Sequence, residues 1–252
     1  MKQQAIHTIR QPGRLRERFF MALPMILYGA VYLLWWSRLE QTNLRHYSEI
    51  HSVIDDMIPF VEIFIVPYLL WFGYCLFTVL YFLFGDDKEE YARVLAFLGF
   101  GMTLFLVIST LFPNELHLRP AYLPRDNIFT RMVAGLYARD TSTNVFPSIH
   151  VYNAIGCHLA LSYSERSSLR TKRLSLVLCI SIVLSTMFLK QHSVYDVLGA
   201  MALCVVADYL VYRTSLVKFV NLSHQLVTAD GDKSAALAGQ VDQISHSRKA
   251  HS

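Results

Sequence analysis

Apolar residues in this chain gather in long runs that short polar segments interrupt. A helix needs about 20 residues to cross the hydrocarbon core of a bilayer, and six runs are close to that length. They lie at residues 19–36, 58–84, 94–112, 146–163, 174–189 and 194–211. The pattern predicts an all-α, polytopic membrane protein in which six transmembrane helices form one bundle.

The composition agrees, because 54% of the residues are hydrophobic and only 17% are charged. Lys and Arg concentrate in the N-terminal tail (1–18) and in the connection at 165–173. Because positive charge marks the cytoplasmic side, both termini are expected in the cytoplasm, and the plasma (cytoplasmic) membrane is the expected location. The predicted organisation is a cytoplasmic tail at 1–18, a six-helix membrane domain at 19–220 and a polar, disordered tail at 221–252.

Three polar stretches are expected together at the outer face of this topology. They are LHLRP, which ends in Arg119 and Pro120, FPSIH, which ends in His150, and STMFLKQHSVYD, which runs from Ser185 to Asp196. Ionisable residues in or beside apolar spans are expensive and are usually functional. These stretches therefore form the candidate site.

His192 and Asp196 are four residues apart at the start of the last span. If that helix begins near Gln191, both side chains share one face, and the carboxylate can accept a hydrogen bond from one ring nitrogen. The other ring nitrogen is then an oriented nucleophile or base. An ordinary surface pair has the same spacing, but a pair that opens an apolar span favours the functional interpretation.

A second histidine, His150, can supply the proton that a departing alkoxide needs. Pro147 suits the first turn of a helix and Ser148 can bond to unpaired backbone amides, so PSIH predicts a helix start. Helix starts favour anions. Taken alone, His150 would be interpreted as a histidine packed at the membrane interface.

Arg119, Lys190 and Ser185 complete a predicted cradle for phosphoryl oxygens. A guanidinium binds such oxygens bidentately, and a lysine adds a point charge. Singly, Lys190 would be a snorkelling residue and Arg119 a loop cation, but their convergence on one face favours phosphoryl transfer. The same outer connection carries three more arginines, which are expected either to steer an anionic head group or to be solvated: Arg125, Arg131 and Arg139.

The motif order resembles that of the type 2 phosphatidic acid phosphatase superfamily, which includes the vanadium haloperoxidases. The order is Arg-Pro, then Pro-Ser-x-His, then Ser with His seven residues later and Asp four residues after that, over residues 110–209. The resemblance implies six helices and phosphoryl transfer that needs no metal or other cofactor. It also implies a phosphohistidine on His192, oriented by Asp196, with His150 as the acid for the leaving group.

The resemblance further places Arg119, Ser148 and Lys190 near the phosphate, on a catalytic face that looks outward. Three positions depart from the family pattern: Phe112 replaces a Lys, Ile149 a Gly and Thr186 an Arg. Altered phosphate ligands beside the His, His and Asp set resemble the inositol phosphorylceramide and sphingomyelin synthases. Those enzymes pass a head group to a lipid alcohol instead of to water.

The leading hypothesis is an integral membrane phosphatase, a metal-independent phosphoric monoester hydrolase of lipid phosphates with a role in lipid metabolism. The alternative is a lipid phosphotransferase of the sphingolipid or phosphoinositol type that uses the same site, and a third hypothesis is a non-catalytic membrane protein. A vanadate-dependent oxidase is disfavoured by the apolar spans.

The expected partners are a lipid phosphate or phospholipid substrate and the bilayer, with no nucleic acid. The sequence leaves the head group, the acceptor and the oligomeric state open. Two acidic residues inside predicted spans, Glu62 and Asp208, are expected to make hydrogen bonds between helices or to lie at a cytoplasmic end.

Overall fold

The structure is a computed structural model that describes residues 12–41 and 46–214. The described chain is mostly helical. Its elements are α1 (Pro12–Glu40), β1 (Ser48–Glu49), α2 (Val53–Met57), a 3₁₀ turn (Glu62–Phe64), α3 (Ile65–Leu83), α4 (Lys88–Leu111), β2 (Asn114–Glu115), α5 (Ile128–Tyr137), α6 (Ile149–Tyr163), α7 (Leu169–Phe188), α8 (Val194–Asp208) and a π-helical turn (Tyr209–Arg213). The predicted C-terminal tail at 221–252 lies outside the described residues.

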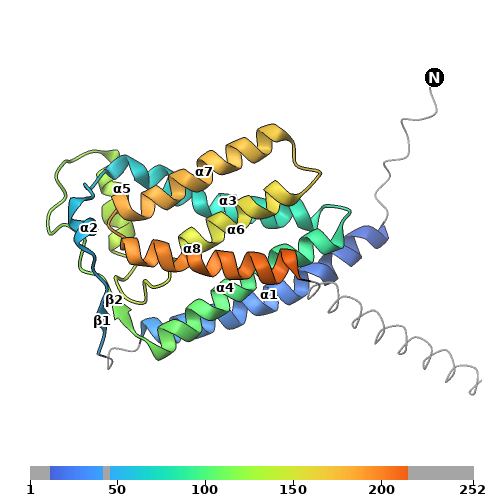
Figure 1. The fold of residues 1–252 in the computed structure, drawn as a ribbon, viewed down its shortest axis with the longest axis horizontal. Helices are drawn as coiled ribbons and strands as arrows, with labels where there is room; N and C mark the ends of the chain where they lie inside the picture. Colours follow the sequence, from blue (N-terminus) through green and yellow to red (C-terminus); the bar gives the residue numbers. More distant parts are fainter. Residues whose placement is uncertain (1–11, 42–45, 215–252) are drawn as a thin grey trace, which may run out of the picture.

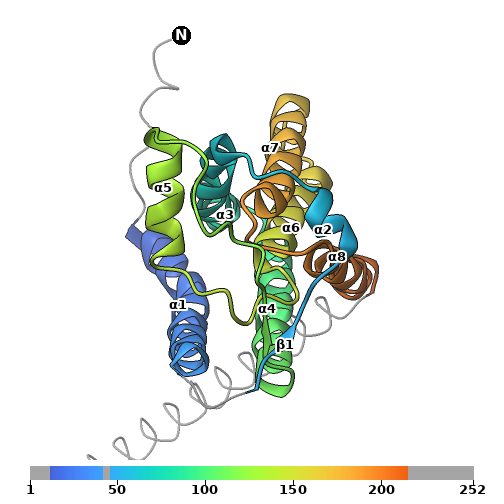
Figure 2. The same cartoon turned by 90° about the vertical axis from the view of Figure 1, so that its left-hand side faces the viewer.

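Helix α6 lies in the middle of the bundle, as Figures 1 and 2 show. It packs against α3, α4, α7 and α8, whereas α1 packs against α3 and α4. The main buried cluster contains residues of α3, α4, α6, α7 and α8. This arrangement explains why the run 151–154 in the first half of α6 is buried throughout.

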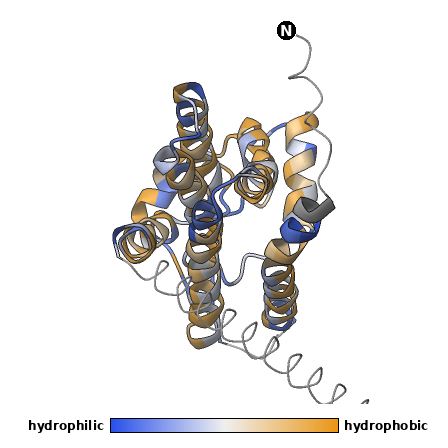
Figure 3. Cartoon of the chain, turned by 90° about the vertical axis from the view of Figure 1, so that its right-hand side faces the viewer, coloured by the Kyte–Doolittle hydropathy of each residue, from blue (hydrophilic) through white to orange (hydrophobic). Residues whose placement is uncertain are grey.

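The outer faces of the bundle are apolar. Leu34, Phe72 and Val205 are 70%, 57% and 71% exposed in the isolated chain. Orange predominates along the helices in Figure 3, whereas blue is concentrated at turns and helix ends. Within the described residues, five helical segments are long and apolar enough to cross a membrane: Arg16–Glu40, Glu62–Leu83, Lys88–Leu111, Leu169–Phe188 and Val194–Arg213. The fold therefore fits a membrane protein.

The predicted span at 146–163 is a helix, but a short one. Helix α6 has 15 residues, which corresponds to a length of about 22 Å, and the hydrocarbon core is about 30 Å thick. By length and composition, five of the six predicted spans are thus supported by the structure. Because other helices surround α6, it needs no lipid-facing surface of its own.

Several helices begin earlier than the apolar pattern predicts, because polar first turns are also helical. Helix α4 begins at Lys88, where the Asp87 carboxylate accepts hydrogen bonds from the amides of Glu89 and Glu90 at 2.8 and 3.2 Å. Helix α7 likewise begins after Ser168, whose hydroxyl oxygen accepts from the Thr171 amide at 3.1 Å. Such caps accept hydrogen bonds from backbone amides that have no partner within the first turn of the helix.

Helices α4 and α6 approach closely through two glycines. A Cβ at Gly101 of α4 would lie 2.0 Å from the ring of Tyr152, and a Cβ at Gly156 of α6 would lie 2.6 Å from the ring of Phe97. The two rings stack at a centroid distance of 5.0 Å, and the Tyr152 hydroxyl donates to the Phe97 carbonyl at 2.7 Å. Small residues at such crossings are typical of membrane helix pairs.

The bundle has two chemically different ends, visible in Figure 1. The short pair β1–β2, the helices α2 and α5, and the first turns of α6 and α8 lie together at one end. The pair β1–β2 is parallel, with Ser48 opposite Asn114. The start of α1 and the turn between α6 and α7 lie at the other end. There Asp208 accepts from the hydroxyl of Tyr163 at 2.8 Å and pairs with Arg213 at 3.4 Å, which joins α6 to the end of α8.

Candidate active site

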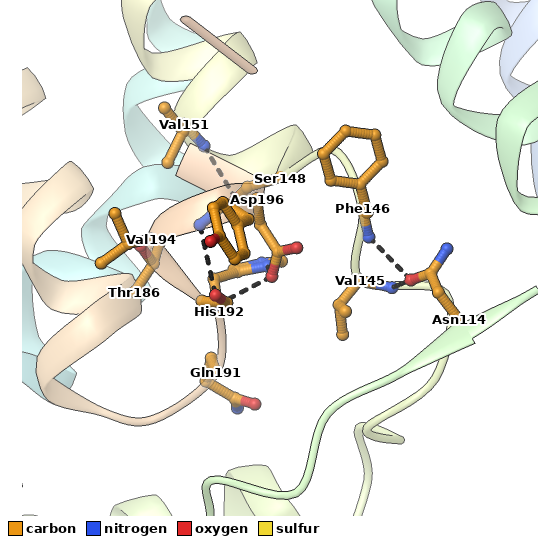
Figure 4. A network of polar contacts seen from close by, with 12 residues as sticks. Asn114, Val145, Phe146, Ser148, Val151, Thr186, Gln191, His192, Val194 and Asp196 are labelled. Atoms are coloured by element: carbon orange, nitrogen blue, oxygen red, sulfur yellow. Dashed lines mark hydrogen bonds and ion pairs between the residues drawn. The ribbon is translucent and has the colours of Figure 1, made fainter. Parts of the chain in front are cut away.

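The predicted contact between His192 and Asp196 is confirmed, although the helix begins later than expected. Helix α8 starts at Val194 with Ser193 as its cap, so His192 precedes the helix. Asp196 folds back over this first turn: its Oδ2 accepts from the Ser193 amide at 2.9 Å and lies 3.2 Å from His192 Nδ1. In Figure 4 the side chains of His192 and Asp196 lie close together at this turn. Asp196 is fully buried, so its carboxylate holds the imidazole in one orientation with Nδ1 engaged.

His150 lies beside His192, at the second position of α6. The two imidazole centroids are 5.8 Å apart. The ring of His150 also stacks on Tyr68 at 4.6 Å and lies 4.4 Å from the indole of Trp71, both on α3. These aromatic contacts fix the plane of the imidazole next to the nucleophile candidate.

Ser148 joins the first turns of α6 and α8. It is the cap of α6, and its hydroxyl oxygen accepts from the Val151 amide at 3.4 Å. Its own amide donates to the Asp196 carbonyl at 3.2 Å. The helix start predicted from PSIH is therefore correct, but Pro147 precedes the cap and does not occupy the first turn. The reason is that Ser148 has an extended backbone, with ψ at 112°.

Arg119 reaches the same site from the long connection between α4 and α5. Its guanidinium donates to the carbonyls of Asp140 and Thr141 at 2.8 and 3.1 Å and to Gln191 Oε1 at 2.6 Å. It also lies 4.5 Å above the ring centroid of Tyr137. Gln191 precedes His192, so Arg119 is held one residue away from the candidate nucleophile.

Ser185 and Lys190 bind protein carbonyls in this structure. The hydroxyl of Ser185 donates to the Ile182 carbonyl at 2.6 Å within α7. The ammonium of Lys190 donates to the Asp55 carbonyl of α2 at 2.6 Å. The role expected for both residues in phosphate binding stays a prediction. What the structure brings together is His150, His192, Asp196, Ser148 and Arg119.

A comparison of the sequence with protein families shows which family the chain belongs to. The family model of the PAP2 superfamily matches residues 94–219, which is half of the 252-residue chain. This protein belongs to the PAP2 superfamily. The match supports phosphatase or phosphotransferase activity on lipid-like phosphates. No curated protein and no solved structure matches the chain.

Two positions where the PAP2 resemblance implies a cation have other uses here. Phe112 follows the last residue of α4 as its C-terminal cap and is 46% exposed. Thr186 is fully buried, and its hydroxyl donates to the Val183 carbonyl at 2.8 Å. Its own carbonyl accepts from the amides of Gln191 and His192 at 2.9 and 3.1 Å. Thr186 therefore shapes the turn that carries His192.

Asp55 contacts the start of α8 next to His192, and sequence reasoning missed this residue. Its carboxylate, on α2, accepts from the Ser193 hydroxyl at 2.6 Å and from the Val194 amide at 2.8 Å. It is 1% exposed. The spacing of Ser52 and Asp55 is that of a capping box and signals a helix start. No local pattern, however, reveals the contact with α8.

Asn114 supports the segment that leads into α6. Its Oδ1 accepts from the amides of Val145 and Phe146 at 2.8 and 3.0 Å, as Figure 4 shows. Its Nδ2 donates to the Phe112 carbonyl at 2.9 Å. Asn114 is fully buried. Its side chain thus fixes the backbone that positions Ser148 and His150.

Glu62 attaches α5 to the start of α3, which resolves its role. Its carboxylate accepts two hydrogen bonds from Arg125, at 2.8 and 3.0 Å, and one from Asn127 at 3.0 Å. Asn127 is in turn the cap of α5. The side chain of Glu62 is 6% exposed. Arg125 is thereby committed to holding α5, whereas Arg131 and Arg139 lie along that helix and beyond its end.

Proposed function

We propose that this PAP2 superfamily member is an integral membrane phosphatase that hydrolyses a lipid phosphate through a phosphohistidine intermediate. The observation that carries the proposal is the set of His192 bound to Asp196 at 3.2 Å with the imidazole of His150 beside it. Arg119, Ser148, Lys190 and Ser185 are the proposed phosphate-binding residues. The proposed chemistry requires no metal or other cofactor.

In the proposed first step, Nε2 of His192 attacks the phosphorus atom while Nδ1 stays hydrogen-bonded to Asp196. The phosphorus–nitrogen bond forms as the bond to the lipid oxygen breaks, and His150 gives that oxygen a proton. Asp196 stabilises the positive charge that develops on His192, as the carboxylate does in serine hydrolase triads. In the second step, water attacks the phosphohistidine with His150 as base, which releases phosphate.

The proposal includes the orientation of the protein. The site end of the bundle faces outward, and the opposite end, with the start of α1 and the α6–α7 turn, faces the cytoplasm. Arg166, Arg170, Lys172 and Arg173 in or next to that turn support this orientation. We further propose that α6 is a sixth, recessed span. Its shortness would place His150 below the surface of the bundle, where neighbouring helices exclude bulk water.

The test is turnover by the detergent-purified protein of a panel of lipid phosphates and phospholipid head-group donors, without divalent metal. We expect free phosphate from wild type and none from His192→Ala. The matched control is His158→Ala, which removes a half-buried histidine that bonds to Ser175 at 3.0 Å on α7. Its activity should stay within about threefold of wild type, because it lies away from the described site.

The same assay separates the alternatives. A new lipid product without free phosphate would favour the phosphotransferase, with the same first step and a lipid alcohol in place of water. No turnover of any lipid by well-folded wild type would refute catalysis and favour the non-catalytic hypothesis. Equal turnover by wild type and His192→Ala would refute the role of His192.

A further inference from the structure

Helix α2 has one apolar face that the described part of the chain leaves uncovered. Val53, Ile54 and Met57 are 77%, 53% and 78% exposed. At about 100° per residue, these side chains lie within one arc of about 100° on the helix surface. Asp55 points in the opposite direction and is buried. A helix of five residues is not stable alone in water, so α2 depends on the groups that contact its two sides.

The inner side of α2 is bonded to the turn that carries His192. The Asp55 carboxylate accepts from the Ser193 hydroxyl at 2.6 Å and from the Val194 amide at 2.8 Å. The backbone carbonyl of Asp55 accepts from the ammonium of Lys190, also at 2.6 Å. These contacts fall on both sides of His192 in the sequence. The position of α2 and the position of this turn are therefore linked.

The contact with α8 fixes the depth of α2 in a membrane. The apolar segment Val194–Arg213 has 20 residues, which corresponds to about 30 Å of helix, and the hydrocarbon core is also about 30 Å thick. The first turn of α8 therefore lies at the boundary of that core. The apolar segment Glu62–Leu83 begins shortly after α2 ends. Both neighbours thus place α2 at the membrane boundary, at the site end of the bundle.

The apolar face of α2 continues the lipid-facing surface of α8. Tyr195, Leu198 and Val205 are each more than half exposed, and their spacing places them on one stripe of that helix. Because Asp55 points at α8, the opposite face of α2 points away from the bundle. In Figure 2, which looks onto this end, α2 lies at the rim of the bundle beside α8. The apolar face of α2 is therefore directed towards the surrounding lipid.

Charged groups flank this face without interrupting it. Asp56 and His51 pair at 3.0 Å, and both side chains are exposed. An apolar side next to a charged one is typical of a segment that lies in the plane of the membrane interface, with its apolar side chains between the head groups and the acyl chains. A bilayer is therefore the partner that fits both the chemistry of this face and its depth.

We propose that α2 is an interfacial anchor, whose apolar face lies in the boundary of the bilayer and thereby holds the turn that presents His192. The coupling to His192 rests on the proposed function, whereas the anchoring does not. Val53, Ile54 and Met57 are positioning residues, since they act on His192 only through Asp55. Loss of the anchor leaves the site residues intact but holds the nucleophile less firmly, so catalysis depends on the membrane contact.

The first test measures whether water reaches α2 in phosphatidylcholine nanodiscs, in which both faces of the bilayer are open. Met57→Cys and Asp56→Cys are treated with a charged, water-soluble thiol reagent. Wild type gives the background of the four native cysteines, which lie in α3, α6, α7 and α8. Both positions are well exposed in the isolated chain, so water on α2 would give equal rates.

If lipid covers the apolar face, Met57→Cys should react at least about tenfold more slowly than Asp56→Cys, because the reagent does not enter the acyl region. Val205→Cys, on the lipid-facing stripe of α8, sets the slow limit. A thermal melt of each variant in detergent checks that the fold is kept.

The second test measures the coupling by kinetics in the same nanodiscs, with p-nitrophenyl phosphate as a water-soluble substrate that does not enter through lipid. Val53→Thr combined with Met57→Gln keeps the size of both side chains but makes them polar. We expect kcat to fall about 3- to 30-fold, since a small displacement of a reacting group is costly. KM should change by less than about twofold, because substrate contacts are kept.

Two comparisons show whether Asp55 carries this effect. In the Asp55→Asn background, Val53→Thr with Met57→Gln should lower kcat by less than about twofold, because the link to the turn is already weakened and the two changes are not additive. Val205→Thr is the matched control, since it makes the same change on a lipid-facing residue that has no link to the turn. Its kcat should equal that of wild type.

The outcomes separate the anchor, the coupling and the proposed function. Labelling of Met57→Cys as fast as that of Asp56→Cys would overturn the anchor. Slow labelling with an unchanged kcat in Val53→Thr with Met57→Gln would overturn the coupling, and so would an equal fall in kcat with and without the Asp55 carboxylate. Turnover that does not depend on His192, or no turnover, would refute the proposed function and the coupling with it, while the labelling rates still decide the anchor.

Discussion

The carboxylate of Asp55 and the hydroxyl of Ser193 lie 2.6 Å apart, although 138 residues separate them in sequence. Asp55 also accepts from the Val194 amide at 2.8 Å. It therefore places a negative charge at the N-terminus of α8, where the helix dipole favours one. Ser193 directly follows His192, so the short helix α2 fixes the turn that presents the candidate nucleophile.

Asp55→Asn should destabilise the protein and lower kcat more than it raises KM. It removes a buried charged acceptor, which we expect to cost about 2–3 kcal/mol of unfolding free energy. The loss of kcat follows because His192 and Asp196 lose the support of Ser193. Thermal melting in detergent and steady-state kinetics measure the two effects. Asp56→Asn is the matched control: its side chain is 61% exposed and bonds to His51, so it should change stability by less than about 0.5 kcal/mol.

His150→Gln should matter most for substrates with poor leaving groups. If His150 protonates the departing oxygen, hydrolysis of an alkyl phosphate needs it, whereas the p-nitrophenolate ion departs from p-nitrophenyl phosphate without a proton. We expect kcat/KM to fall about 10²- to 10⁴-fold for the alkyl ester. For the nitrophenyl ester the fold-decrease in kcat/KM should be at least about tenfold smaller. Measurement of both esters with wild type and variant decides this. Equal losses would show that His150 contributes packing against Tyr68 and Trp71 and not proton transfer.

Asp140 should make the KM for an anionic lipid depend on pH. Burial raises its pKa above the ordinary value of 3.8, so the carboxylate takes up a proton at a higher pH than an ordinary aspartate does. As the pH falls through that pKa, its repulsion of the substrate disappears. The ratio of wild-type KM to that of Asp140→Asn should be about 2- to 10-fold at pH 7 and should approach one in acid.

Taking this ratio at each pH cancels the titration of the lipid and of the histidines. Asp86→Asn, which alters a 93% exposed side chain that pairs with Arg18 near the start of α1, should give a ratio near one throughout. A ratio for Asp140→Asn that stays constant across the pH range would show that Asp140 does not act on the substrate through its charge.

Gly156→Ala should loosen the contact between α4 and α6. The new Cβ would lie 2.6 Å from the ring of Phe97, and overpacking of this kind costs about 1–3 kcal/mol. Alanine's better helix propensity returns about 1 kcal/mol, so a net loss of thermal stability is expected. Gly73→Ala on α3 adds a Cβ with nothing within 4 Å and should be neutral or stabilising. A melt in which both variants behave alike would contradict the close packing.

The apolar pattern located the main helices because membrane-length runs are a local property of the sequence. It misjudged the starts of α4 and α7, where charged first turns are helical but not apolar. It also overlooked α2 and α5, which are shorter than a span. For α5 a local signal exists, since Asn127 and Thr130 form a capping box before an amphipathic segment.

Within the site, the sequence determined what depends on a few adjacent residues. The pairing of His192 with Asp196 and the cap formed by Ser148 follow from spacing and from the chemistry of helix starts. The contact survives although α8 begins later than expected, because an acidic residue at the third helical position folds back over the cap. The order of the motifs along the chain was likewise enough to indicate the PAP2 superfamily.

Only the tertiary structure decided which distant residues share this end of the bundle. Asp55 under α8, Glu62 holding Arg125, and Arg139 at a cavity that His150 also lines each depend on contacts between segments more than 10 residues apart, and no local pattern encodes such contacts. The four arginines of the outer connection have the same side chain, yet two are committed to the protein and two border an open cavity. The physical reason is that a charge acquires its role from the groups that surround it, and those groups are brought together by packing of the whole bundle.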